Sequence, residues 1–380
     1  MISNVKKIRY EPFGGIIFSE KLVATVFVDK DYMESLGYRE CKMWEKKQNY
    51  LSAPLYVHFN LTNRCPKQCK YCYADSIPKA EDKLSFPEIK KIIDVLADLK
   101  VFSIAYGGGE PFSRKDIFEI AKYTRQKGIV PNITTNGIYI DERNVELCKI
   151  FGHIQLSIDL LEENISVENR RWYKIILLSK KVGINVGLNY ILTKESYKYL
   201  EDICYYANKC GVREIMFLRL KPFGRGKAFY DDNKLSNEQN IRFFPTIKKL
   251  SKKYQIKPIV ECSFLPMIYH HRPNIETLKF FGFEGCRGGN YFVEIDYQGF
   301  VKSCSFCEDY AGEARELKYL WDNSSHFKLF RNWNKNSPFP CSRCDYLETC
   351  KGGCHSIAKA LTGNFLNPDP ECPFVQNIRI

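Results

Sequence analysis

The sequence has no long apolar run and no apolar segment near its start. No stretch of about 18 apolar residues could span a membrane, and the opening residues, MISNVKKIRYEPFGG, lack the apolar core of a secretory signal. Histidine is also scarce, with 6 residues dispersed over the 380 of the chain. We therefore expect a cytoplasmic protein with no membrane partner.

Cysteine, in contrast, is abundant. Sixteen cysteines would suggest disulfides in a secreted chain, but the cytoplasm keeps thiols reduced and available to iron. The chain is 44% hydrophobic and 14% aromatic, so it can bury one large core and a smaller module. This composition argues against a disordered protein.

Acidic residues are fewer than basic ones. The counts are 44 Asp and Glu against 57 Lys and Arg, for a net charge of +13. The basic residues are scattered over predicted helix faces, for example at 88–91, and form no single block. This pattern indicates a solvated surface, and nucleic acid is not expected as a partner.

Three cysteines form a closely spaced group directly after an apolar, β-prone run at 55–59. Cys65, Cys69 and Cys72 have the spacing Cys-x3-Cys-x2-Cys. A zinc knuckle is the alternative, but structural zinc usually takes four ligands, and no fourth Cys or His lies nearby. An iron–sulfur cluster on three thiolates would keep one iron open for a ligand. The triplet therefore indicates a redox enzyme.

From the triplet onward, predicted strands and helices alternate. A capping box at Ser85 and Glu88 opens a helix to about Leu99, and a second helix runs over 116–126. Further strands are predicted at 101–106, 130–134, 154–158, 185–192 and 214–220, with helical runs near 144–150, 168–181 and 197–210. Six parallel strands with outer helices predict an α/β fold, a partial (β/α)6 TIM-like barrel.

The unusual residues fall in the loops after these predicted strands, where such a barrel carries its chemistry. In chain order the loops hold the Cys triplet, GGGEP at 107–111, TTNG at 134–137, SID at 157–159, and Arg219 with KPFGRG at 221–226. A glycine run lets backbone approach a ligand, and Glu110 can accept a hydrogen bond from an ammonium group. Each motif alone is compatible with a plain turn or strand end. Their order favours one shared site.

Together these residues resemble the radical S-adenosylmethionine (SAM) enzymes. The resemblance covers roughly residues 55–226 and depends on the three cysteines, on GGEP at 108–111 and on the strand order. It implies a [4Fe-4S] cluster on Cys65, Cys69 and Cys72, with the amino and carboxyl groups of SAM on the open iron.

The resemblance also implies a set of SAM contacts. These are Tyr71, Gly108, Gly109, Glu110, Ser157, Asp159 and either Arg170 or Arg171. The glycines and the glutamate would hold the methionine amine, the tyrosine would lie by the adenine, and the serine and aspartate would approach the ribose or carboxylate. An arginine would pair with the SAM carboxylate. Many relatives have Gly after the aspartate, whereas this chain has Leu160.

Enzymes of this family reductively cleave SAM to a 5′-deoxyadenosyl radical, which abstracts hydrogen from an unactivated C–H bond. The resemblance therefore also implies a low-potential electron donor, a flavodoxin or ferredoxin. The cofactor performs the difficult step, and the protein orients the reactants and excludes competing reactions.

The C-terminal third contains a second cysteine pattern. Its members are Cys286, Cys304, Cys341, Cys344, Cys350, Cys354 and Cys372. Seven thiolates are too many for one cluster and one short of two closed shells, so one position would be filled from elsewhere or left open. A pair of zinc sites is the alternative, and the upstream triplet favours iron.

This segment looks like the SPASM domain of radical SAM enzymes. By resemblance, a first auxiliary [4Fe-4S] cluster would take Cys286, Cys304 and Cys354, and a second would take Cys341, Cys344, Cys350 and Cys372. With the cluster on the triplet, three clusters are implied. Residues 277–285, where some relatives carry the fourth ligand of the first auxiliary cluster, contain no cysteine. Cys307 and Cys262 are the candidates, and an iron open to substrate is the alternative.

The first fifty residues are predicted as a separate segment. Short strands at 7–10, 15–18 and 22–28 precede a possible helix at 31–37. This is similar to the start of peptide-binding modules that capture a leader peptide on an exposed strand edge. The segment is too short for a whole module, so a cap on the barrel is favoured. We divide the chain into 1–50, a radical SAM barrel at 51–260 and a SPASM domain at 261–380.

Three functions are compatible with these patterns. The favoured one is a radical SAM/SPASM maturase that modifies a residue of a ribosomally made peptide or protein, giving a crosslink or an oxidised side chain. The second is the same chemistry on another target, as in anaerobic sulfatase-maturing or pyrroloquinoline-quinone-type cofactor enzymes. The third is a non-enzymatic, zinc-rich interaction protein. No general base can be chosen from the sequence.

Overall fold

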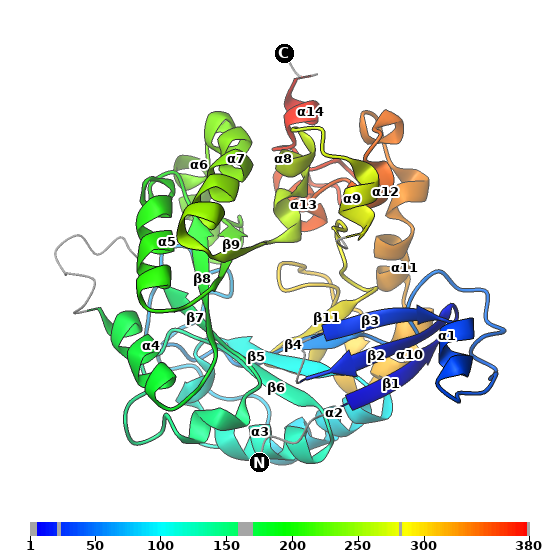
Figure 1. The fold of residues 1–380 in the computed structure, drawn as a ribbon, viewed down its shortest axis with the longest axis horizontal. Coiled ribbons are helices and arrows are strands. Elements are labelled where there is room, and N and C mark those ends of the chain that lie inside the picture. The colour runs from blue at the N-terminus through cyan, green and yellow to red at the C-terminus, as the bar shows by residue number, and fades with distance from the viewer. Residues whose placement is uncertain (1–5, 21–23, 159–169, 281–282, 378–380) are drawn as a thin grey trace.

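The main body of the protein is a curved sheet of ten strands with helices on its outer side (Figure 1). The computed structural model describes residues 6–20, 24–158, 170–280 and 283–377. The strand order is β10-β9-β8-β7-β6-β5-β4-β11-β12-β13. In chain order the strands are β4 (Tyr56–Thr62), β5 (Ser103–Gly108), β6 (Val130–Thr135), β7 (Ile154–Ile158), β8 (Val186–Leu192), β9 (Glu214–Arg219), β10 (Lys257–Val260), β11 (Phe292–Ile295), β12 (Phe300–Lys302) and β13 (Gly312–Glu313).

The predicted barrel is confirmed, and the sheet extends beyond it. The six predicted strands, β4 to β9, pair in parallel in chain order. β10 adds in parallel beside β9, and β11 adds in parallel beside β4. β12 and β13 continue this edge in antiparallel fashion. The C-terminal segment therefore supplies strands to the same sheet that carries the Cys triplet.

The outer helices follow from their apolar spacing. They include α2 (Phe86–Asp98), α3 (Ile117–Gln126), α4 (Arg171–Lys181), α5 (Leu200–Lys209), α6 (Gly226–Asn233) and α7 (Asn237–Tyr254). The predicted capping box of α2 is present, because the Ser85 backbone N–H donates to Glu88 Oε2 at 2.8 Å. Ile89, Ile93 and Leu96 form the buried face of α2, as expected for residues three to four apart.

One predicted helix is wrong. The run near 144–150 contains only the 3₁₀ turn η2 (Leu147–Ile150). The Asn144 side chain donates to the carbonyl of Tyr139 at 2.7 Å and accepts from the backbone N–H of Asp141 at 3.1 Å. Such local side-chain bonds to backbone compete with helical ones.

Side chains alternate along each strand between an apolar face of the sheet and a polar face. On β4, Val57, Phe59 and Leu61 belong to the core that the helices cover. Tyr56, His58 and Asn60 therefore lie on the opposite face, toward the inside of the barrel. On β7, Ser157 lies on that inner face, between the core residues Leu156 and Ile158. Polar side chains thus line the inside of the curved sheet.

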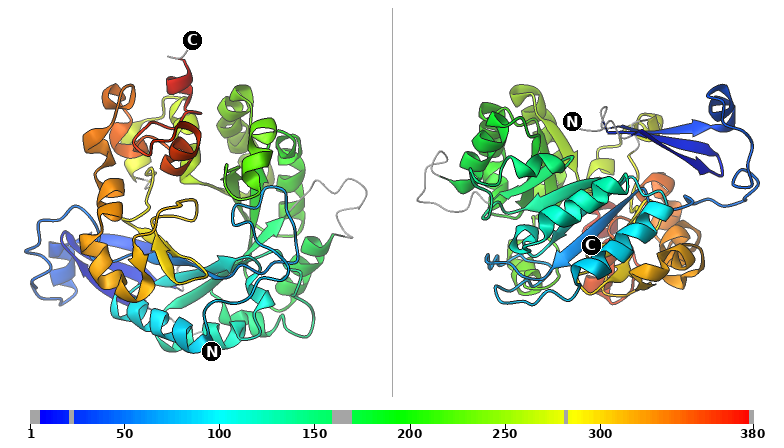
Figure 2. Two further views of the ribbon diagram at one scale, coloured as in Figure 1. Left: turned by 180° about the vertical axis from the view of Figure 1, so that it is seen from behind. Right: turned by 90° about the horizontal axis from the view of Figure 1, so that it is seen from below.

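The N-terminal segment forms a separate antiparallel sheet, as predicted. It contains β1 (Lys6–Glu11), β2 (Gly14–Ser19) and β3 (Ala24–Asp29), followed by the helix α1 (Lys30–Ser35). Leu22, in the third predicted strand, lies outside the described residues. Arg9 fixes the sheet to the barrel by donating to the carbonyls of Pro54 and Ala53 at 2.7 and 2.8 Å. β1 and β3 are the two edge strands of this sheet, which projects from one side of the barrel (Figure 2).

Short helices between the two ends of the curved sheet make up the C-terminal segment (Figure 1). They are α8 (Leu265–Tyr269), α9 (Ile275–Phe280), α10 (Leu317–Asn323), α11 (Ser325–Arg331), α12 (Leu347–Cys350), α13 (His355–Thr362) and α14 (Pro373–Gln376). A search of the described part of the chain found no helix with the length and apolar character needed to cross a bilayer.

Candidate functional site

The Cys triplet lies in the loop that follows β4. Cys65 is buried, and its backbone N–H donates to the carbonyl of Ile77 at 3.0 Å. Burial raises the pKa of the Cys65 thiol, and the nearby charges of Glu110, Cys69 and Cys72 raise it further. Thiols gathered in this way are costly to ionise unless a bound cation compensates them. The donor set therefore fits a metal cluster.

Asn136, in the loop after β6, contacts the triplet directly. Its side-chain amide donates to Cys65 Sγ at 3.6 Å. Its backbone N–H donates to Glu110 Oε2 at 2.8 Å. The TTNG motif, identified from its place after a predicted strand, is thus joined to both the first cysteine and the Gly-Gly-Glu motif.

Glu110 is fully buried, and three donors already occupy its carboxylate. Besides the Asn136 backbone, the Phe112 N–H and the Thr135 hydroxyl donate to its Oε1 at 3.1 and 2.7 Å. Burial raises the pKa of Glu110 to about 7, against these hydrogen bonds, which lower it. A carboxylate has about four lone-pair positions, so roughly one acceptor position remains for an ammonium group.

The glycines before Glu110 allow close approach of two backbone segments. Gly108 has a φ of +111°, and a Cβ there would lie 2.3 Å from the carbonyl oxygen of Thr62. The Gly109 N–H donates to that same oxygen at 2.7 Å. Only glycine fits such a contact, which holds the end of β5 against the start of the Cys loop.

Arg225, in the loop after β9, holds the triplet from another side. Its Nε donates to the carbonyl of Cys69 at 3.0 Å, and its Nη1 contacts Asp75 Oδ1 at 2.8 Å. A Cβ at Gly224 would lie 2.6 Å from the Cys72 carbonyl oxygen. The loops after β4, β5, β6 and β9 therefore meet at the triplet, as expected for one mouth of the barrel.

For the other predicted SAM contacts, the structure shows different surroundings. Tyr71 lies in the Cys loop, with its ring 6.5 Å from that of Phe229. Arg171 donates to the carbonyls of Gly137, Ile138 and Ile140, so its guanidinium is engaged with backbone. Arg170 is buried. Asp159 lies outside the described residues.

Four of the C-terminal cysteines line one small cavity. Cys341, Cys344, Cys350 and Cys372 surround a volume of about 30 Å³ whose other walls include Pro266, Tyr269 and Val375. Burial raises the pKa of Cys341 to about 12, and the charges of Cys372 and Cys344 add to the effect. Four thiols converging in an apolar pocket fit a closed four-thiolate site.

The remaining C-terminal cysteines form a second group. Burial raises the pKa of Cys286 to about 12, with contributions from Cys354 and Cys307. The pKa of Cys304 is raised by burial and by the other thiols of this group, and its Sγ lies 3.3 Å from the Ser356 hydroxyl. The pKa of the Cys262 thiol is also raised, chiefly by burial and further by the charges of Cys286 and Cys354. Five thiols therefore gather where four are needed.

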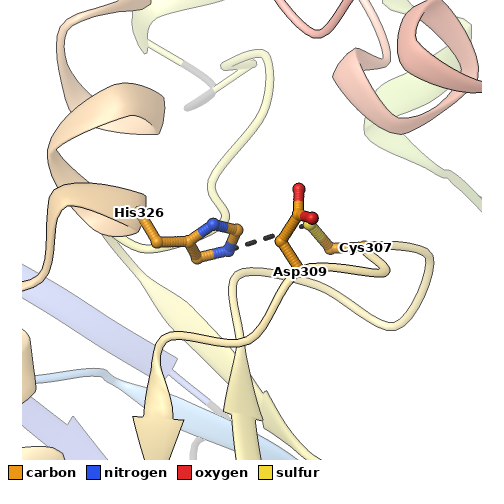
Figure 3. Close-up of side chains that lie close together, drawn as sticks. All are labelled: Cys307, Asp309 and His326. Carbon is orange, nitrogen blue, oxygen red and sulfur yellow. Dashed lines mark hydrogen bonds between the residues drawn. The ribbon is translucent and has the colours of Figure 1, made fainter. Parts of the chain in front are cut away.

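Cys307 has additional polar neighbours. Its Sγ lies 3.7 Å from His326 Nε2, and the ligand atoms of Cys307, Asp309 and His326 lie within 4.8 Å of one another (Figure 3). Cys262 comes before Cys286 in the chain, at the start of η5 (Cys262–Phe264), which follows β10. Both Cys307 and Cys262 thus lie near Cys286.

A buried lysine neutralises charge near this group. The Lys221 Nζ lies 2.9 Å from Glu261 Oε1 and 5.0 Å from the centre of the Phe306 ring. Burial lowers the pKa of Lys221, but Glu261 and Cys354 outweigh it and the pKa is raised. Lys221 therefore stays cationic beside Cys354, a favourable partner for a thiolate-bound cluster.

Comparison with known proteins identifies the family of this site. The sequence pattern of the Radical SAM superfamily matches residues 59–207, which contain the triplet and Glu110. Residues 59–207 are therefore a radical SAM domain. A radical SAM enzyme uses SAM and a [4Fe-4S] cluster, and the donor set at Cys65, Cys69 and Cys72 fits that cluster.

Relatives of this radical SAM enzyme are similar over most of its length. The PqqA peptide cyclase of Granulibacter bethesdensis is 28% identical, over 85% of this chain and 88% of the relative. The mycofactocin maturase MftC of Mycobacterium tuberculosis is 26% identical, over 87% and 86%. Streptococcus suis SuiB, solved with S-adenosylmethionine, has the same fold, with a TM-score of 0.77, 18% identity and coverage of 98% and 100%.

Several residues of the site were not selected from the sequence. Asn136 and Arg225 lie inside motifs that the loop positions had indicated, but nothing distinguished them from their neighbours. Glu294 on β11 had one signal, since it is the only charged residue in the apolar strand Phe292–Ile295. A charge in such a strand is rarely buried without a partner or a role.

Proposed function

We propose that this radical SAM enzyme is a maturase that modifies a residue of a ribosomally made peptide or protein. The observation that carries the proposal is the meeting of four barrel loops at the triplet, with two further groups of buried thiols in the C-terminal segment. The similarity to a peptide cyclase and to MftC supports a peptide substrate. So does the fold of SuiB, which has also been solved with its precursor peptide SuiA.

The triplet and the surrounding loops would hold the SAM-binding cluster and SAM. Cys65, Cys69 and Cys72 would ligate the cluster. The end of β5 at Gly108, Gly109 and Glu110 would receive the methionine amine, at the acceptor position that the carboxylate retains. Bound there, the two cofactors would supply the 5′-deoxyadenosyl radical.

The remaining contacts concern the rest of SAM. Tyr71 would lie by the adenine, and Ser157, on the inner face of β7, would approach the ribose or carboxylate with Asp159. Either Arg170, which is buried, or Arg171, whose guanidinium also donates to three carbonyls, would pair with the SAM carboxylate.

The C-terminal thiols would hold two auxiliary [4Fe-4S] clusters, for three in all. The cavity lined by Cys341, Cys344, Cys350 and Cys372 supports a closed second auxiliary site. Cys286, Cys304 and Cys354 would ligate the first, with Cys307 as its fourth ligand and Cys262 or an open iron as the alternatives.

The partners follow from this chemistry. A flavodoxin or ferredoxin in the cytoplasm would deliver the electron that SAM cleavage consumes. The favoured role of the segment 1–50 is a cap on the barrel, since Arg9 donates to the backbone carbonyls at 53–54. The outer edge of β3 remains the position where a leader peptide could add a strand.

The test is mass spectrometry of a peptide encoded beside this gene, incubated anaerobically with reconstituted enzyme, SAM and reductant. Oxidative crosslinking would remove about two hydrogens under the hydrogen-abstraction scheme. An enzyme with all three triplet cysteines replaced by Ala is the control. Production of 5′-deoxyadenosine without any change in peptide or protein substrates would overturn the maturase proposal.

A different target is the second candidate. Sulfatase maturation or cofactor biosynthesis would use the same site, and the relative named PqqA peptide cyclase shows that a peptide can serve as substrate within this range. The zinc-rich interaction protein is set aside, because the radical SAM domain at residues 59–207 is that of an enzyme superfamily and contains the cysteine triplet.

A further inference from the structure

Glu294 is a buried carboxylate on the inner face of the barrel. Its neighbours on β11, Val293 and Ile295, belong to the helix-covered core, so Glu294 lies on the opposite face. Its backbone is in register with His58 of β4 and with Lys302 of β12. Only 1% of the residue is exposed.

The carboxylate of Glu294 is only partly satisfied. The Asn60 side-chain amide donates to Oε1 at 2.6 Å. The Lys302 Nζ lies 3.9 Å from the same oxygen, at the long limit of an ion pair. Oε2 is buried without a donor in hydrogen-bonding geometry among the described residues. Such an unpaired charged oxygen is costly, so it needs a reason to be retained.

The position of this carboxylate supplies a reason. Tyr73, which follows Cys72 of the triplet, has Glu294, Asn60 and Ser305 as its polar neighbours. Ser305 follows Cys304 of the first auxiliary group and also lies beside Glu294. The ring of Phe306 packs against that of Tyr73 at 5.0 Å. Glu294 therefore sits where the loop of the SAM-binding cysteines meets the loop of an auxiliary thiol.

Asn60 connects the same point to the SAM-binding motif. It is in register with Gly107 of β5, and a Cβ at Gly108 would lie 3.2 Å from the Asn60 Cβ. Asn60 thus lies between the Glu294 carboxylate, to which it donates, and the Gly-Gly-Glu motif. Glu294 therefore lies close to the end of β5, where the proposed SAM site is.

We propose that Glu294 accepts the proton that the substrate loses when its new bond forms, and so is the general base of this enzyme. This inference rests on the proposed function. It names a role for which the sequence had supplied no residue.

The step balances in atoms and electrons. Joining a substrate carbon to a second substrate atom, or oxidising it, removes two hydrogens. One leaves as a hydrogen atom in 5′-deoxyadenosine. The other would leave as a proton to Glu294 Oε2, and the electron left on the substrate would be taken up by an iron–sulfur cluster that the C-terminal thiolates would hold.

Other groups at this place are poorer proton acceptors. Burial lowers the pKa of His58 to about 4, so it is neutral but weakly basic. Glu110 already accepts three hydrogen bonds. Burial raises the pKa of Glu294, against the charge of Lys302 and the neighbouring Ser305, both of which lower it. A carboxylate of raised pKa is a better base than an ordinary one.

The test compares Glu294→Gln and Glu294→Asp with the control Glu214→Gln, which lies at the amino-terminal end of β9. The first measurement needs no peptide: unfolding of the reconstituted holoenzyme. Gln replaces the carboxylate oxygen that has no donor and keeps an acceptor for Asn60, so Glu294→Gln should unfold at or above the wild-type temperature. A clear fall would assign Glu294 a structural role and overturn the proposal.

The second measurement uses the peptide substrate of this enzyme, with deuterium at the position from which hydrogen is abstracted. Glu294→Gln should keep its iron and still move deuterium into 5′-deoxyadenosine, while product formation falls roughly 100-fold. Glu294→Asp should recover part of the product. Unchanged product yield in Glu294→Gln would overturn the proposal. Failure of the proposed function is distinct, because there wild-type enzyme itself gives no modified peptide.

Discussion

The guanidinium of Arg219 lies 2.6 Å from Asp369 Oδ2, although 150 residues separate the two in the chain. Both side chains are buried. Arg219, at the end of β9, also donates to Glu371 Oε2 at 2.7 Å and to the Ser263 carbonyl at 2.8 Å. The same Asp369 oxygen accepts from the backbone N–H of Cys354 at 3.1 Å.

This relationship connects the barrel to both C-terminal thiol groups. Cys354 belongs to the first group, and Glu371 directly precedes Cys372 of the second. A single cation on a barrel strand therefore orients backbone next to one cysteine of each group. Buried carboxylates of this kind are tolerated only while their partner is present.

Replacing Arg219 should destabilise the protein and loosen both auxiliary sites. Arg219→Met leaves Asp369 and Glu371 buried without their cation, which should cost about 3–5 kcal/mol of unfolding free energy. Arg219→Lys should also be destabilising, because an ammonium cannot bond both carboxylates in a bidentate manner. Urea unfolding and iron content are the measurements. Lys257→Met, at an exposed lysine, is the control, and equal stability of all three proteins would contradict the argument.

Replacing Cys65, Cys69 and Cys72 together by Ala should abolish reductive SAM cleavage. The C-terminal thiols lie in other loops, so iron held there should remain. Measurement of 5′-deoxyadenosine and iron on the same sample checks this. Cys204→Ala, at a buried packing cysteine of α5, controls for the loss of a thiol. Undiminished deoxyadenosine production in the triple variant would refute the assignment.

The auxiliary cysteines should separate SAM cleavage from product formation. Cys286→Ala or Cys304→Ala should leave SAM cleavage measurable but stop the product, because the electron from the substrate then has no acceptor. Cys341→Ala or Cys344→Ala should show a mixed folding and redox defect, since these thiols line a small cavity packed between apolar side chains such as Tyr269 and Val375. Three [4Fe-4S] clusters would hold about twelve irons. Full product yield from Cys286→Ala would show that this site is not needed for turnover.

The fourth ligand of the first auxiliary site can be found by comparing two single variants. If Cys307 ligates iron, Cys307→Ala should alter the electron paramagnetic resonance signal of that cluster, whereas Cys262→Ala should leave it unchanged. The reverse result would transfer the role to Cys262. Unchanged spectra in both variants would indicate an iron that is open to substrate.

Glu110 should make stability depend on pH. Its pKa rises from 4.5 to about 7 in the folded protein, chiefly through burial. Between these values the folded state retains a proton that the unfolded state has lost. The contribution of Glu110 to stability should therefore fall as pH rises from about 4.5 to 7, and stay constant above.

Glu110→Gln removes this titration, so thermal unfolding measured over the same pH interval should show a smaller slope. The variant should also bind SAM more weakly, because the amide cannot accept an ammonium as a carboxylate does. A loss of iron with unchanged SAM affinity would instead make Glu110 a purely structural residue.

The local features of this protein were determined by its sequence alone. Cysteine spacing identified the triplet because its three members lie in one short loop, from Cys65 to Cys72. The Ser85–Glu88 capping box and the apolar positions of α2 predicted that helix, since both patterns repeat within one element. The run at 144–150 failed because Asn144 and Asp141 bond to nearby backbone, which periodicity does not register.

The tertiary structure decided what depends on residues far apart in the chain. It placed β11 beside β4 and so brought Glu294 to Asn60 across 234 positions. It also joined Arg219 to Asp369 and Asn136 to Cys65. The sequence marks some of these positions as unusual, but it does not show which residue each of them will contact. Only packing removes the water around such a side chain and places specific partners within hydrogen-bond distance, and that is the physical reason why its role appears only in the folded chain.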